Sequence, residues 1–146
     1  SGVHRVLAWV ARAALVGGVP LVLIAAVLGG IVGAKALRRR RRRLAPRVST
    51  RFVGGWRELV DHARDLGQPI PLGPATRREQ ARSFDREAAP TLARTADRHV
   101  FGPSSPRAEA ASAYWVDVDA ARRAMLDDLP RLRRIQALLS LRSFRR

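Results

Sequence analysis

Glu58, His62 and Asp65 have the residue types and spacing that come closest to a chemical site in this 146-residue chain. On a helix they stand at i−4, i and i+3, so an imidazole and two carboxylates share one face and could ligate a metal ion. Ordinary charge pairs on a helix surface have the same spacing, and we favour that interpretation. We therefore assign no metal ligand and expect no cofactor.

Paired carboxylates occur twice, in Asp117-x-Asp119 and in Asp127-Asp128. Basic residues close in sequence are expected to pair with them, which leaves neither pair available as a general acid and base. These basic residues are Arg122, Arg123 and Arg131.

The sequence lacks the residues and motifs that usually support nucleophilic catalysis. The chain has no cysteine, which excludes thiolate nucleophiles, thiolate metal sites and disulfides. Ser104, Ser105 and Ser140 do not stand beside a base in any recognised motif, and the sequence has no phosphate-binding glycine loop. We expect no catalytic residue and no enzyme activity in this chain.

The longest uninterrupted pattern is the uncharged run of 22 residues from Ala13 to Ala34. As a helix it is about 33 Å long, and the hydrocarbon core of a bilayer is about 30 Å thick. The run therefore predicts a transmembrane helix over residues 13–37, after an interfacial lead-in over residues 1–12. A signal peptide is the alternative, because Ala34-Lys35-Ala36 resembles a cleavage site. The length of the run and the arginines that follow argue against it.

Charge is concentrated beside this run. Of the net charge of +16, residues 1–51 contribute eleven basic groups and no acid. Seven basic residues follow the run and two precede it, which predicts a cytoplasmic C-terminal side and an extracytoplasmic N-terminal side. Basic residues here are also expected to contact anionic lipid headgroups. The predicted membrane-interface residues are Trp9, Arg12, Lys35, Arg38, Arg39, Arg40, Arg41, Arg42 and Arg43.

Small residues within the run predict a second feature. Gly29 and Gly33 form a Gly-x-x-x-Gly motif, which lets another transmembrane helix approach closely. That helix would belong to the same protein or to a partner.

After an arginine-rich flank over residues 38–48, residues 49–146 are expected to form a cytoplasmic helical domain. Ser49 or Thr50 could cap the first helix, and Gly67 could end it. Gly54-Gly55 fits either a later start near Trp56 or close packing of another backbone. The expected core residues are Phe52, Trp56, Leu59, Val60 and Trp115.

Further helices are expected along the domain. Thr76-x-x-Glu79 fits a capping box, and Pro90 either starts a helix or kinks one. Ser105-Pro106 resembles a helix start, and Leu132, Ile135, Leu138 and Leu139 line a last helix among arginines. No alternating strand pattern occurs, so the fold class is all-α: one transmembrane helix followed by a small cytoplasmic helical bundle.

Several segments carry a resemblance to a known family. They are FVGGWRELVDHARDLG (52–67), ATRREQA (75–81), Phe101-Gly102-Pro103 and LLSLRSFRR (138–146). Together they resemble the C-terminal part of bacterial, actinobacterial-type transglutaminase-like membrane proteins. The chain departs from the family at Arg77, where proline is frequent, and at Phe101, where tyrosine is frequent. The resemblance implies an upstream domain with a Cys-His-Asp triad, whose residues have no counterpart in this sequence.

Two functions follow as hypotheses. The first is a non-catalytic membrane anchor with a cytoplasmic interaction domain, belonging to a larger transglutaminase-like membrane protein and contacting an unidentified protein partner. The second is a cytoplasmic binder of anionic lipid, polymer or nucleic acid through its arginines. Most of the charge lies at the membrane flank, which favours the first, and without interleaved aromatic residues specific nucleic-acid binding is not expected.

Overall fold

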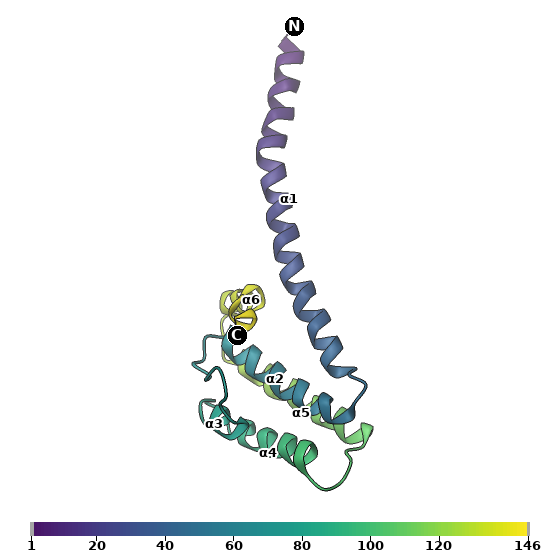
Figure 1. Ribbon diagram of the computed structural model, residues 1–146. Coiled ribbons are helices and arrows are strands. Elements are labelled where there is room, and N and C mark those ends of the chain that lie inside the picture. The colour runs from purple at the N-terminus through teal and green to yellow at the C-terminus, as the bar shows by residue number, and fades with distance from the viewer. Residues whose placement is uncertain (1, 146) are drawn as a thin grey trace. The chain divides into compact units, whose positions relative to one another are not determined.

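The computed structural model describes residues 2–145, and the fold over this range is all-α, with no strand among these residues (Figure 1). Six α-helices are followed by a short 3-10 helix. In chain order they are α1 (Gly2–Arg43), α2 (Val48–Asp65), α3 (Arg77–Arg82), α4 (Ala88–Phe101), α5 (Ala108–Asp127), α6 (Arg131–Leu139) and η1 (Arg142–Phe144).

The chain divides into two compact units, with the boundary between Lys35 and Ala36. The first unit consists of the apolar part of α1. An 18-residue window there has a mean hydropathy of 2.5 and is 0% buried, so this helix is long and apolar enough to cross a membrane. Pro20 lies inside the helix without ending it.

The second unit begins two residues before the arginine run, so residues expected to flank the membrane belong to the folded domain. Its first full helix, α2, begins at Val48 with Arg47 as N-cap, and neither Ser49 nor Thr50 caps it. The helix ends as expected: Gly67 adopts a φ of +89°, and Gln68 donates its amide to the Ala63 carbonyl at 3.0 Å. This is the glycine-terminated helix end that the sequence predicts.

The capping box of α3 is confirmed. The Glu79 amide donates to the Thr76 hydroxyl at 3.3 Å, and the Thr76 amide donates to a Glu79 carboxylate oxygen at 2.7 Å. The Thr76 amide, together with the Thr76 hydroxyl, which donates to the same carboxylate oxygen at 2.9 Å, holds the pKa of Glu79 below its ordinary value.

Two other expected helix starts are shifted. The helix α4 begins at Ala88, so Pro90 lies at its third position, where its missing N–H has no intrahelical partner to lose. The helix α5 begins at Ala108 with Arg107 as N-cap, two residues after Pro106.

The core of the second unit lies between α2, α4 and α5, with α3 covering one side (Figure 1). All five residues expected in the core are buried: Phe52, Trp56, Leu59, Val60 and Trp115. The Trp115 indole donates to the Arg51 carbonyl at 3.1 Å, which ties α5 to α2.

Candidate functional site: an arginine junction and the adjoining cavity

The two glycines of α2 are positions of close approach. A Cβ on Gly54 would lie 2.8 Å from the Arg42 Cβ and 3.1 Å from the Arg42 carbonyl oxygen, so only glycine lets the end of α1 lie against α2 here. A Cβ on Gly55 would lie 2.7 Å from the Tyr114 ring of α5. Of the two explanations offered by the sequence, close packing of another element is the one observed.

Ion pairs surround this contact. Arg42 donates to an Asp61 carboxylate oxygen at 2.8 Å and to a Glu58 oxygen at 3.2 Å, and Arg38 lies 3.5 Å from Asp61. The side chains of Arg42, Glu58 and Asp61 are only 16%, 10% and 13% exposed. Charge pairs this well shielded from water are coupled far more strongly than surface pairs.

Asp119 of α5 completes the cluster. It accepts a hydrogen bond from Arg39 and lies 3.5 Å from Arg43. Arg122 joins both sides, at 3.6 Å from Glu58 and 3.7 Å from Asp119. Burial lowers the pKa of Arg122, while Glu58 opposes this shift.

We call this cluster the arginine junction. It consists of Arg38, Arg39, Arg42, Arg43, Glu58, Asp61, Asp119 and Arg122.

The junction divides the arginine run between two roles. Arg38, Arg39 and Arg42 stand at i, i+1 and i+4 and face the domain, where they are half-buried. Arg40 and Arg41 lie outside this face and are exposed, with no ion pair to any described residue. A prediction that treated the run as one membrane flank could not make this division. The spacing of Glu58 and Asp61 on one face of α2 was the available signal.

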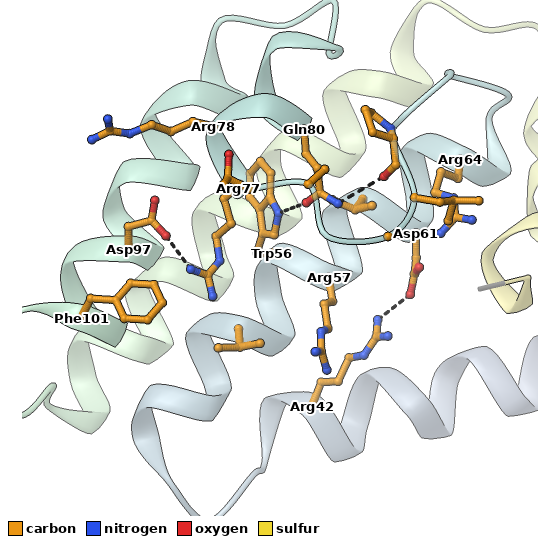
Figure 2. Close-up of a pocket in the computed structure, with 17 residues that line it drawn as sticks. Arg42, Trp56, Arg57, Asp61, Arg64, Arg77, Arg78, Gln80, Asp97 and Phe101 are labelled. Atoms are coloured by element: carbon orange, nitrogen blue, oxygen red, sulfur yellow. Dashed lines mark hydrogen bonds and ion pairs between the residues drawn. The ribbon is translucent and has the colours of Figure 1, made fainter.

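A cavity of about 850 Å³ adjoins the junction, with Arg42 and Asp61 common to both (Figure 2). Its walls come from the end of α1, α2, the proline-rich loop between α2 and α3 (residues 66–76), α3 and the end of α4. The lining residues are Arg42, Val53, Trp56, Arg57, Val60, Asp61, Arg64, Pro71, Leu72, Gly73, Ala75, Thr76, Arg77, Arg78, Gln80, Asp97 and Phe101.

Hydrogen bonds fix the walls of the cavity. The Trp56 indole donates to the Gln80 side-chain oxygen at 2.8 Å, and the Gln80 amide donates to the Pro71 carbonyl at 3.3 Å, as Figure 2 shows. On another wall, Arg77 bonds Asp97 and lies over the ring of Phe101, 5.6 Å from its centroid. The cavity therefore has a fixed, partly apolar wall with cationic groups around it.

Only some of the arginines that line the cavity have an acidic partner. Arg42 and Arg77 are neutralised by Asp61 and Asp97, whereas Arg57 and Arg78 are exposed and make no ion pair with any described residue. Thr76 is the one hydroxyl in the lining, and it is bonded within the capping box. No histidine, cysteine or lysine is among the described lining residues. The arrangement suits recognition of an anion and offers no nucleophile with an adjacent base.

The remaining predicted site residues stand as follows. Trp9 is 77% exposed, and a Cβ on Gly29 or Gly33 would meet nothing within 4 Å, so both glycines are accessible to another helix. Of the three residues spaced for a metal, Glu58 bonds Arg42, and Asp65 accepts the Ser143 amide at 3.0 Å.

His99 has a partner that the sequence did not reveal. Its ring stacks on the buried Phe52, with centroids 4.3 Å apart. It therefore packs against the core and belongs to neither the junction nor the cavity.

Comparison of the chain with protein-family models, with curated proteins and with solved structures finds no match.

Proposed function

We propose that this chain is a non-catalytic membrane anchor and cytoplasmic interaction domain. The observation that carries the proposal is the long apolar helix, in which no residue of the most hydrophobic window is buried. An uncovered apolar surface of this size in water is strongly unfavourable, and a bilayer removes the cost.

The junction shows where the proposed interaction domain begins. The end of α1 supplies Arg38, Arg39 and Arg42 to ion pairs within the second unit. The proposed interaction domain therefore starts directly after the apolar segment in the sequence, which suits a domain that holds a partner at the membrane.

The cavity is the proposed interaction site. Its unpaired Arg57 and Arg78, beside the apolar Val53 and Leu72, favour an acidic segment of a partner protein that also presents an apolar side chain. Replacing Arg57 and Arg78 by glutamate should abolish such binding, while replacing the exposed Arg94 and Arg123 should not. Binding that withstands the first change would remove the cavity from the proposal.

We further propose, from the sequence resemblance, that the anchor serves a transglutaminase-like membrane protein. In that case the catalytic Cys-His-Asp residues belong to a domain upstream of Ser1. Mass spectrometry of the natural polypeptide tests this, and an upstream region without such a triad contradicts it.

Insertion itself is tested by expression of the chain in a bacterial host followed by alkaline carbonate extraction. The chain should stay with the membrane pellet. A variant with Leu23 and Val27 replaced by arginine should be released, because each charge at the centre of a span costs about 2.5–3.5 kcal/mol. Release of the unaltered chain would contradict the anchor.

A further inference from the structure

The last helix, α6, turns a row of large apolar side chains away from the domain. Leu132, Ile135 and Leu138 are 68%, 53% and 57% exposed, and Leu141 just beyond the helix is 53% exposed. The sequence pattern suggested a helix of the bundle, but these leucines are not part of the core. Within α6 only Ala137 is buried.

The apolar row and the domain-facing side lie on opposite sides of the helix. At about 100° per residue, Leu132, Ile135, Leu138 and Leu139 span roughly 120° of the helix circumference. Ala137 falls on the other side. One side of α6 thus packs on the domain, and its other side is apolar and exposed. An exposed apolar surface of this kind is typical of a binding surface.

The segment is firmly held, so its exposed face is a fixed feature of the domain. In η1, the Ser143 carbonyl accepts from Arg38 at 3.2 Å, and the Ser143 amide donates to Asp65 at 3.0 Å. Arg64 donates to the Arg145 carbonyl at 2.8 Å. At the start of α6, Arg134 donates to the Leu129 carbonyl at 2.9 Å.

The charged residues of the C-terminal segment itself have one sign. Residues 130–146 contain six arginines and no acid. Arg131 and Arg133 are exposed and form no ion pair with the described residues. The surface is therefore complementary to an anionic one.

We propose that α6 lies in the interfacial region of an anionic bilayer, with its leucine face among the acyl chains and its arginines among the lipid phosphates. Arg131 lies within the apolar arc and Arg133 lies on the other side of the helix. An apolar helix face accompanied by arginines, whose long side chains can reach the phosphates, has the composition of an in-plane membrane helix. The inference rests on the proposed anchor, because a domain tethered to a membrane meets lipid at a high effective concentration. The same tether favours lipid over a soluble partner as the occupant.

The absence of cysteine makes the test direct. Single cysteines are introduced as Ile135→Cys, Gln136→Cys or, as a control on the exposed surface of α5, Ser112→Cys, and each is spin-labelled. The full chain is reconstituted in vesicles of phosphatidylcholine alone or with one quarter phosphatidylglycerol. Accessibility to oxygen, which concentrates in lipid, is compared with accessibility to a water-soluble nickel complex.

In the anionic vesicles the label at 135 should gain oxygen accessibility and lose nickel accessibility at least severalfold relative to the label at 112. The label at 136, on the edge of the apolar face, should change less. Replacing Arg131 and Arg133 by glutamine should weaken the anionic-lipid effect, with an unchanged circular dichroism spectrum as the folding control.

Two results would overturn the proposal. A label at 135 that stays as accessible to nickel as the label at 112 would show that the face is in water. A label at 135 shielded from both reagents would show that a protein surface, including a second copy of the chain, covers the face. Either result can occur while the span remains inserted, so failure here is distinguishable from failure of the anchor.

Discussion

Trp56 is buried in the core, packs against an aromatic ring and donates a hydrogen bond. It is 3% exposed, its ring centroid lies 5.7 Å from that of Phe84, and its N–H bonds Gln80. Its place in the core could be predicted from helical periodicity alone. Its bond to Gln80 could not, because that bond depends on how the proline-rich loop returns α3 to α2.

Trp56→Ala should therefore destabilise the second unit by about 3–5 kcal/mol, because it empties a packed site and leaves Gln80 without its donor. Urea unfolding of the full chain in a neutral detergent, followed by circular dichroism, measures this. Trp9→Ala should leave the same transition unchanged. A midpoint unaffected by Trp56→Ala would place the core elsewhere.

Tyr114 is buried, and its hydroxyl makes no hydrogen bond to the described residues. Burial raises the pKa of this phenol well above its ordinary value of 10.0. The unfolded chain therefore ionises first. The stability linked to Tyr114 is complete below about pH 10 and is lost as the pH rises toward the folded-state value.

Tyr114→Phe should leave stability at pH 7 within about 1 kcal/mol of the unaltered chain, since no hydrogen bond is broken. Above about pH 10 the phenylalanine variant should become the more stable of the two. Thermal unfolding at both pH values tests this, and since Tyr114 is the one tyrosine of the chain, no other phenol contributes. A large loss at pH 7 would reveal a hydrogen bond that this account lacks.

At the scale of elements, the sequence predicts the existence of the helices better than their partners. Helical periodicity identified the core face of α2, and the Thr76 capping box located α3, because these signals are local. The division of the arginine run and the outward face of α6 depend on which helices meet. The sequence does not distinguish arginines that pair with Asp61 and Asp119 from arginines that contact lipid.

The arginine junction gives a paired prediction. Arg42→Ala should destabilise the second unit by about 3 kcal/mol, because Glu58 and Asp61 keep their buried charges and lose their nearest partner. The adjacent Arg41→Ala should change stability by less than about 0.5 kcal/mol, since Arg41 is exposed. Equal effects in urea unfolding would contradict the junction.

At the scale of the whole molecule, the boundary between the units places the junction within the second unit. A fragment of residues 36–146 should unfold at a higher temperature than one of residues 47–146. The shorter fragment lacks the arginine partners of Asp61, leaves Asp119 with Arg122 alone, and exposes Gly54 to water. Calorimetry of the two fragments compares them directly, and identical midpoints would show that the end of α1 contributes nothing to the fold.

Single cysteines measure most directly the proposed orientation of the chain in the membrane. In intact bacterial cells, a membrane-impermeant maleimide should label Val3→Cys at once and should label Ser112→Cys only after the membrane is permeabilised. This is the pattern that seven basic residues after the span and two before it predict. Labelling of Ser112→Cys in intact cells, with protection of Val3→Cys, would contradict the account.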